Sequence, residues 1–416
     1  MSIFEELKWR ATLWWRAFCR GEHGIGCDIV SPCCMLFLIA IGVTTILSAQ
    51  SCHSGTQWKM QIVWTAIGML AYLVISFTDY RLLLRHAHWI YGFGILALLL
   101  VFSPLGMRKF GATRWLNVCG VVIQPSEIAK LGTLVMGAGV LARTKIGNLK
   151  ESLSSIAYFC LIFLIPVGFI MLQPDLGSSL PFFPIAFALL FVSGVPGKFF
   201  TTIFSLLLIV VGLVAWDAYA YHLYLDENHL SPQNAMGQFE QISFLPLKDY
   251  QRNRIISFVA PDVVDPKGIG VSWNLRQSLI AVGTGGLHGK GHQKGTQARL
   301  GYLPQSVATN DFVFSVFAEE QGFLGGIFVL LLYFILLGNN LRIASMSRDR
   351  FGSLLAIGIS VMLLVHIGVN IGMTLGLMPI TGIPLPFLSY GGSFMMVCCV
   401  LQGVVQSIYR FRSKYS

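Results

Sequence analysis

Residues 304–320, Pro-Gln-Ser-Val-Ala-Thr-Asn-Asp-Phe-Val-Phe-Ser-Val-Phe-Ala-Glu-Glu, contain the point where a long polar segment ends and an apolar run begins. The polar segment covers residues 221–311, and Asp311 is its last residue. A carboxylate at the edge of a membrane span is costly to desolvate, so it is by default a candidate for a functional site. The alternative role of Asp311 is to cap the helix predicted to begin at Phe312.

Apolar runs dominate the rest of the chain. Its 416 residues are 55% hydrophobic and 12% charged, which is about half the charged fraction of a typical soluble protein. The predicted fold class is an all-α polytopic membrane protein, because a β-barrel would show short alternating segments. About ten runs approach the roughly 20 apolar residues that cross a bilayer, centred on residues 33–49, 60–77, 86–102, 127–142, 155–172, 180–195, 200–220, 312–336, 353–376 and 388–408.

The Lys and Arg residues of the short loops predict the orientation. Sixteen of them lie in the termini and the loops on one side, and four lie in the loops on the other. The positive-inside rule then places both termini in the cytoplasm. The segment 221–311, between the seventh and eighth predicted helices, becomes one large outer loop. We interpret the net charge of +10 as loop charge that sets the topology, and we expect no nucleic-acid partner.

Two regions are predicted along the chain. Residues 1–31 form a cytoplasmic N-terminal segment, which is either an interfacial helix with Ile3, Leu7 and Trp14 on one face or a loosely ordered tail. Residues 32–412 form the transmembrane domain. The nine cysteines show no Cys/His spacing typical of a metal site, so no protein-built metal site is expected.

The stretch Gln124-Pro125-Ser126-Glu127, followed by Lys130, opens the fourth predicted span. Ser126 can cap this helix, and Glu127 suits its positive end. Glu127 and Lys130 are three residues apart, so they can pair on one face. The stretch is therefore either a helix start with an internal ion pair or, with Arg114 just upstream, a site for a pyrophosphate.

Three other stretches carry candidate residues. The Gly-rich stretch 283–295 with Lys290 is either a phosphate cradle or a flexible turn. Asp175, in a tight turn between two spans, is expected first to cap the next helix. Arg252 and Arg254 suit phosphate geometry, or else belong to a surface helix in which they pair with neighbouring Asp residues such as Asp249.

A fourth stretch precedes the last span. Prolines at positions 379, 384 and 386 predict a broken or re-entrant entry, which a membrane tolerates only when it is buried or lines a cavity.

Taken together, residues 30–412 resemble the SEDS family of shape, elongation, division and sporulation proteins. The run Thr381-Gly-Ile-Pro-Leu-Pro-Phe387 is more similar to the elongation branch than to the division branch, which stays the alternative. The motifs that carry the resemblance are Arg114-Trp115, Gln124-Pro-Ser-Glu-x-x-Lys130, Gln173-Pro-Asp-Leu-Gly177, Tyr250-Gln-x-x-Arg254-Ile, Gln277-Ser278-x-Ile-Ala-x-Gly283-x-Gly-Gly, Gly289-Lys-Gly291, Gly295-Thr-Gln297, Asp311-Phe312, Glu319-Glu320-x-Gly322 and Ser389-Tyr-Gly-Gly392.

The resemblance implies a peptidoglycan glycosyltransferase that polymerises lipid II during cell-wall elongation, in the bacterial cytoplasmic membrane. It implies that Asp311 is the general base that takes the proton of the acceptor hydroxyl. The resemblance implies that the pyrophosphate leaving group is held with or without a divalent cation, Mg or Mn. The implied partners are a class B penicillin-binding protein and other membrane proteins of the elongation machinery. The implied substrate-binding residues are Arg114, Lys130, Arg254, Lys290, Gln124, Glu127 and Asp175.

One departure from the family pattern precedes Asp311. The family usually reads Pro-Glu-x-His-Thr-Asp-Phe, whereas residues 304–312 are two residues longer, have Gln305 in place of the Glu, and lack the His.

Two other functions compete with the glycosyltransferase. A lipid II flippase would need a polar path through the midplane, whereas the charged residues here cluster on the predicted outer side. A non-catalytic scaffold for a partner synthase would not polymerise lipid II by itself.

Overall fold

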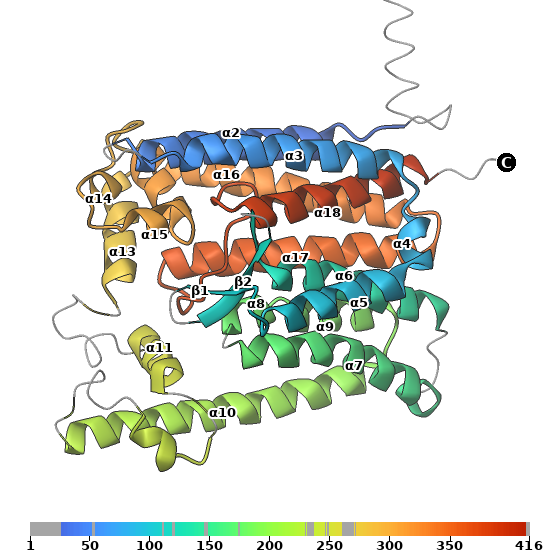
Figure 1. Cartoon of the computed structure of the whole chain (residues 1–416), viewed down its shortest axis with the longest axis horizontal. Coiled ribbons are helices and arrows are strands. Elements are labelled where there is room, and N and C mark those ends of the chain that lie inside the picture. Colours follow the sequence, from blue (N-terminus) through green and yellow to red (C-terminus); the bar gives the residue numbers. More distant parts are fainter. Residues whose placement is uncertain are drawn as a thin grey trace, which may run out of the picture.

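The computed structural model describes residues 26–51, 55–109, 112–118, 121–144, 149–173, 175–228, 230, 237–245, 247, 249–259, 270 and 272–412. The long helices lie side by side in one bundle (Figure 1). Ile3, Leu7 and Trp14, which carry the interfacial helix predicted within residues 1–31, lie outside the described residues, so this helix stays a prediction.

Seven helices in the described part of the chain are long and apolar enough to cross a membrane. The all-α polytopic membrane class is therefore confirmed. They are α2 (Val30–Ala49), α3 (Gln57–Phe77), α7 (Leu149–Leu172), α10 (Gly197–Glu227), α16 (Val313–Ser345), α17 (Arg350–Thr374) and α18 (Gly392–Arg410).

Helices also stand at the other three predicted spans. α5 (Ala87–Leu100) is apolar but shorter, and α6 (Pro125–Arg143) carries charged residues. α9 (Phe182–Val192) stands at the sixth predicted span, and the short helix α8 (Leu176–Ser179) precedes it. The total of ten crossings and the orientation stay predictions.

Burial divides the bundle into a centre and a periphery. In the apolar windows of α17 and α18, 72% and 78% of residues are buried inside the protein, against 22% in α3 and none in α10. α10 accordingly runs along one side of the bundle (Figure 1). Its apolar side chains therefore need lipid to cover them, whereas α17 and α18 are covered by other helices.

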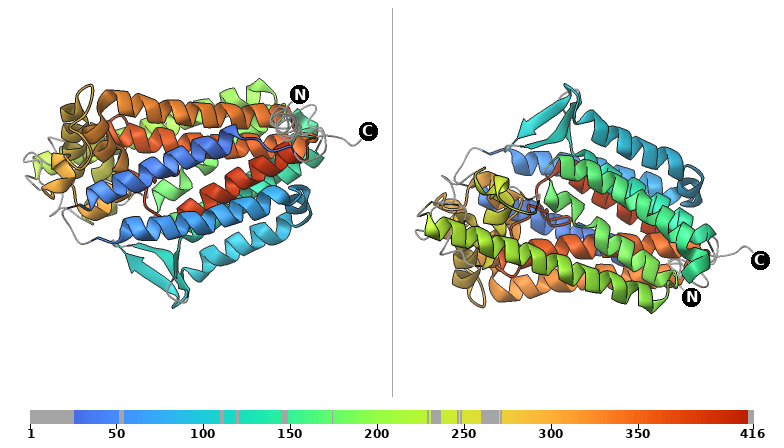
Figure 2. Two further views of the ribbon diagram at one scale, coloured as in Figure 1. Left: turned by 90° about the horizontal axis from the view of Figure 1, so that it is seen from above. Right: turned by 90° about the horizontal axis from the view of Figure 1, so that it is seen from below.

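A small antiparallel sheet was not anticipated from the sequence. Its strands β1 (Gly106–Lys109), β2 (Ala112–Val118) and β3 (Val121–Ile123) follow in the order β1-β2-β3. Leu116 pairs with Gly106 on one side and Ile123 on the other. Figure 2 shows the sheet projecting from one side of the bundle, before α6 begins.

The polar segment gathers at one end of the bundle (Figure 1). α2 begins and α18 ends at the opposite end, as the predicted orientation of the termini requires. The elements of the segment after α10 are η1 (Phe239–Gln241), α11 (Asp249–Val259), α13 (Trp273–Gly285), α14 (Thr296–Arg299) and α15 (Gln305–Thr309).

A buried arginine holds the first part of this segment together. The Arg252 guanidinium is fully buried and donates to Asp217 Oδ2 at 2.8 Å and to Asp249 Oδ1 at 2.9 Å. It also lies 5.1 Å from the ring centroid of Phe239. The expected pairing with Asp249 is confirmed. The phosphate-binding interpretation of Arg252 is wrong, because its buried guanidinium already donates to Asp217, Asp249, Ser243 and the carbonyls of Leu245 and Leu247.

A break in α16 joins the Gly-rich stretch to the bundle. Gly322 interrupts the helix with φ 67° and ψ −165°, and a Cβ there would lie 2.3 Å from the Gly289 nitrogen. The N–H of Lys290 donates to the Glu319 carbonyl at 3.0 Å, and that of Phe323 donates to the Gly286 carbonyl at 2.8 Å. The left-handed φ and the close approach of the two chains explain the glycine at position 322.

Candidate active site

Asp311 lies in the turn between α15 and α16. Its carbonyl accepts a hydrogen bond from Asn370 Nδ2 of α17 at 2.9 Å, and its side chain is partly exposed. The N-cap residue of α16 is Phe312, and the helix begins at Val313. The capping interpretation is therefore wrong by one position, and tertiary contacts of the backbone hold Asp311 in place.

The Pro-rich segment 379–390 packs directly against this turn. Ser389 Oγ donates to the Asn310 carbonyl at 2.6 Å. Gly382 has φ 74°, and a Cβ at that position would lie 3.6 Å from Asp311 Oδ2. The predicted non-helical entry to the last span is confirmed, because α18 begins only at Gly392. Because Gly382 has no side chain, the segment places only its backbone beside the Asp311 carboxylate.

The expected ion pair of Glu127 and Lys130 is confirmed. Lys130 Nζ lies 2.7 Å from Glu127 Oε1, and the two side chains are 1% and 2% exposed. Lys130 Nζ also lies 3.1 Å from His366 Nε2. α6 begins at Pro125 with Gln124 as its N-cap residue. The expectation that Ser126 caps the helix is therefore wrong, because Ser126 is already inside it.

Asp175 is linked to two other predicted residues, to Arg114 directly and to Gln124 through Ser178. Its carboxylate caps α8, accepting from the Ser178 N–H at 3.2 Å and from Ser178 Oγ at 2.8 Å. Arg114 NH1 lies 3.5 Å from Asp175 Oδ1, and Gln124 Nε2 donates to Ser178 Oγ at 3.1 Å. The capping role expected of Asp175 is confirmed, and the carboxylate also binds the strand residue Arg114.

This group lies next to the same Pro-rich segment. A Cβ on Gly177 of α8 would lie only 2.4 Å from the Thr381 carbonyl, the residue before Gly382. The Asp311 carboxylate and α8, the helix that Asp175 caps, therefore approach segment 379–390 at consecutive residues, Gly382 and Thr381.

Lys290 is not part of this arrangement in the structure. Its ammonium lies 2.6 Å from Glu319 Oε1 and 2.8 Å from Thr296 Oγ1. The backbone N–H groups of Lys290 and Gly291, which a phosphate cradle would need, donate to carbonyls at the break in α16. The cradle interpretation is therefore wrong for these groups, and a substrate role for Lys290 would require its ammonium to leave Glu319.

Arg254 lies on α11, but its side chain falls outside the described part of the structure. Its predicted role stays a prediction.

Two residues of this region were missed from the sequence. His366 and Asn370 are one turn apart on α17, and both are buried. A polar residue in an otherwise apolar span is a functional signal in itself, and this signal could have identified them.

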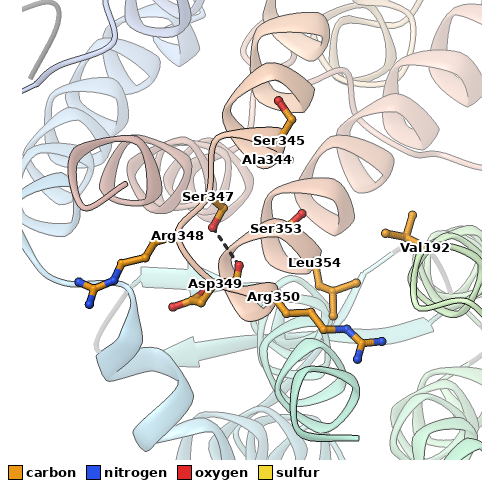
Figure 3. A pocket seen from close by; sticks show the side chains of 9 residues that line it. All are labelled: Val192, Ala344, Ser345, Ser347, Arg348, Asp349, Arg350, Ser353 and Leu354. Carbon is orange, nitrogen blue, oxygen red and sulfur yellow. Dashed lines mark hydrogen bonds between the residues drawn. The ribbon is translucent and has the colours of Figure 1, made fainter. Parts of the chain in front are cut away.

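A cavity of about 380 Å³ lies at the opposite end of the bundle from Asp311. Figure 3 shows that the side chains of Arg348 and Arg350 extend to opposite sides, so they do not converge on one anion. Arg350 donates to the carbonyls of Thr144 and Ser193, which close the ends of α6 and α9. This cavity is not the candidate site.

The fold and the site define a polytopic membrane protein with a carboxylate at the polar end of its helix bundle. Comparison with known families identifies which one: a family model described as FTSW_RODA_SPOVE, "Cell cycle protein", matches residues 29–414. The chain belongs to this family, which is the SEDS family indicated by the motifs.

Curated relatives cover nearly the whole chain. "Peptidoglycan glycosyltransferase RodA" of Treponema pallidum (strain Nichols) is 32% identical over 421 residues, covering 90% of this chain and 95% of the relative. "Peptidoglycan glycosyltransferase MrdB" of Escherichia coli (strain K12) is 33% identical over 389 residues, covering 93% and 95%. "Probable peptidoglycan glycosyltransferase FtsW" of Trichlorobacter lovleyi is 31% identical, covering 92% of each.

Solved structures agree with this assignment. A chain described under "Structural coordination of polymerization and crosslinking by a peptidoglycan synthase complex" matches with a TM-score of 0.72 at 28% identity, covering 93% of this chain and 99% of that one. The rod shape determining protein RodA of Thermus thermophilus matches with a TM-score of 0.64 at 26% identity, covering 94% and 99%.

Proposed function

We propose that this protein is a peptidoglycan glycosyltransferase that polymerises lipid II during cell-wall elongation. The observation that carries the proposal is the placement of Asp311, whose backbone is held by α17 and whose carboxylate lies beside Gly382. Relatives named peptidoglycan glycosyltransferases align with 90% or more of this chain. Their names favour this function over the flippase and the scaffold.

The chemistry proposed for Asp311 is general base catalysis. The carboxylate takes the proton from the 4-hydroxyl of the acceptor sugar while that oxygen attacks the anomeric carbon of the donor. The bond from that carbon to the pyrophosphate breaks, and undecaprenyl pyrophosphate leaves with the electron pair. A single displacement inverts the anomeric centre and gives a β-1,4 linkage. A positioned base contributes roughly 10²–10⁴-fold to such a reaction.

Lys130 and Arg114 are proposed to hold the leaving pyrophosphate. Both have a carboxylate partner, Glu127 and Asp175 respectively, which fixes the position of the cation. A preorganised cation in a site with little water stabilises developing negative charge far more than it would in bulk solvent.

A divalent cation remains a proposal of its own. Among the described residues, no three His, Cys, Asp or Glu side chains gather at one point. Mg²⁺ or Mn²⁺ would therefore be held mainly by pyrophosphate oxygens, as Mg²⁺ commonly is, with one carboxylate such as Asp311 or Asp175. Loss of activity with EDTA, and its recovery with added Mg²⁺ or Mn²⁺, tests this.

The proposed location is the bacterial cytoplasmic membrane, with Asp311 on the outer face. The proposed partner is a class B penicillin-binding protein, supported by the match to a chain from a peptidoglycan synthase complex. Lipid II is the proposed substrate, and other elongation proteins are further proposed partners. A division role is the alternative, and depletion of the protein distinguishes the two, since loss of rod shape supports elongation and filamentation supports division.

The decisive experiment measures glycan formation from labelled lipid II by the purified protein with its penicillin-binding partner. Asp311→Asn keeps the shape of the side chain and removes the base, so we expect the rate to fall by roughly 10²–10⁴-fold. Asp226→Asn is the matched control, because Asp226 is an exposed carboxylate at the end of α10. Equal rates for wild type and Asp311→Asn would reject the mechanism, and absence of product from wild type would reject the activity.

A further inference from the structure

His366 is a buried histidine inside the bundle whose two ring nitrogens both have polar neighbours. The residue is 1% exposed, and its ring stacks on Phe394 of α18 with centroids 5.0 Å apart. Nε2 lies 3.1 Å from Lys130 Nζ, and Nδ1 lies 3.3 Å from the Pro384 carbonyl. The ring is thus fixed in its plane and at both nitrogens.

These neighbours assign the tautomer of His366. A carbonyl only accepts hydrogen bonds and an ammonium only donates them. Nδ1 must therefore carry the proton that points at Pro384, and Nε2 must accept from Lys130. The Lys130 ammonium is consequently held from two sides, by the Glu127 carboxylate at 2.7 Å and by this imidazole.

The other end of the ring reaches the segment beside the proposed base. Pro384 follows Gly382 by two residues, and Gly382 is the residue beside the Asp311 carboxylate. One turn further along α17, Asn370 Nδ2 donates to the carbonyls of Ile383 at 2.7 Å and of Asp311 at 2.9 Å. One face of α17 therefore binds Lys130, segment 379–390 and the Asp311 turn.

Without His366, the Lys130 ammonium would keep one hydrogen-bond partner among the described residues, Glu127. Glu127 binds it through Oε1, while Glu127 Oε2 is buried without a hydrogen-bond partner among the described residues. The ammonium could then shift toward that second oxygen, which would withdraw it from any other anion. The imidazole acceptor opposes this shift.

We propose that His366 is a positioning residue, which aims the Lys130 ammonium at the pyrophosphate of the lipid-linked substrate. This inference rests on the proposed function, because it requires Lys130 to bind pyrophosphate.

Two substitutions separate the two contacts of His366. In His366→Gln, the amide oxygen lies where Nε2 was and can still accept from Lys130, whereas the Nδ1 donor is lost. In His366→Asn, the amide nitrogen can still donate to Pro384, whereas the acceptor for Lys130 is lost. Ser360→Ala on the same helix is the matched control, because Ser360 is buried and donates to the Ala356 carbonyl, one turn away on its own helix.

The experiment measures kcat/KM for lipid II polymerisation by the protein with its partner. We expect His366→Asn to lower it by about 10–100-fold, because a displacement of about 1 Å in a positioned group costs on the order of 10²-fold. We expect His366→Gln to retain most of the activity and Ser360→Ala to match wild type. In a Lys130→Met background, His366→Asn should cause no further loss, because both changes remove the same interaction.

A binding measurement gives a readout that does not depend on turnover. Fluorescent undecaprenyl pyrophosphate should bind His366→Asn more weakly than wild type, and Lys130→Met at least as weakly as His366→Asn. Equal losses for Asn and Gln, or full additivity with Lys130→Met, would show a packing role and overturn the inference.

The two proposals fail in different ways. If wild type makes glycan and His366→Asn matches it, the inference fails and the proposed function stands. If wild type makes no glycan, the proposed function fails, and the binding measurement alone decides on His366: weaker binding by His366→Asn supports its role and equal binding rejects it.

Discussion

Arg252→Met tests the buried arginine that organises the start of the polar segment. In the native protein Arg252 is fully buried between Asp217 and Asp249, whose side chains are 8% and 1% exposed. It also donates to the carbonyls of Leu245 and Leu247 at 3.1 and 2.6 Å. Methionine fills much of the volume but leaves two carboxylates and two carbonyls without this donor.

The expected cost follows from the uncompensated charges. Removing one partner of a buried ion pair destabilises by roughly 3–5 kcal/mol, mostly because the remaining charge stays buried. The destabilisation should be confined to η1, α11 and the end of α10. These elements share a small apolar cluster, which includes Tyr221, Phe239 and Ile256 and has no residue in common with the core of the main bundle. Amide hydrogen exchange in α11 should speed up by on the order of 10²–10³-fold, because each 1.4 kcal/mol is about tenfold.

Hydrogen exchange of the protein in nanodiscs is the assay, with Arg299→Met as the matched control. Arg299 is an exposed arginine at the end of α14, and its loss should leave α11 unchanged. Adding Asp217→Asn and Asp249→Asn to Arg252→Met should recover part of the protection, because the buried charges are gone. Unchanged exchange in Arg252→Met would refute the reasoning.

Two further predictions concern stability. Gly322→Ala should lower the melting temperature by several degrees, because φ is 67° and the new Cβ would lie 2.3 Å from the Gly289 nitrogen; Gly338→Ala on the same helix, with no atom within 4 Å of its Cβ, should not. Burial and the hydrogen bond to Asp349 raise the pKa of Tyr80 to about 12. The folded state therefore keeps this proton longer than the unfolded state, so stability should fall between pH 10 and about 12. In denaturant titrations Tyr80→Phe should lose less stability than wild type over that range, and equal losses would contradict the assignment.

Features that depend on local spacing were predictable from the sequence. The apolar runs located a helix at each predicted span, because the length of a membrane crossing is set by the bilayer. The pairing of Glu127 with Lys130 follows from helix geometry alone, and so does the capping by Asp175. Asp311 was identifiable because polarity changes abruptly at that residue.

Features that depend on distant contacts were not predictable from one sequence. The sequence suggested that Arg252 binds phosphate, because its buried ion pair with Asp217 of α10, 35 residues earlier, depends on tertiary packing. The backbone N–H groups of Lys290 and Gly291 donate to carbonyls beside the break at Gly322, which lies 32 residues after Lys290. The sequence does not reveal this distant contact, so the stretch was interpreted as a phosphate cradle. The β1–β3 sheet was missed because its short strands lie in a loop between two spans, where apolar patterning is weak.

The hydrogen bonds at the break inside α16 and at the turn before it imply an order of assembly during synthesis. At the break, the N–H groups of Phe323 and Leu324 donate to the carbonyls of Gly286 and Leu287. These carbonyls leave the ribosome before α16 does, so the N–H groups can form their hydrogen bonds as soon as they emerge. The turn at Asp311 has the opposite dependence. The Asp311 carbonyl can accept its hydrogen bond only after Asn370, 59 residues later, has been synthesised. The Asn310 carbonyl can accept its own only after Ser389, 79 residues later, has been synthesised. The turn that carries the carboxylate therefore reaches its final shape only after nearly the whole chain has entered the membrane.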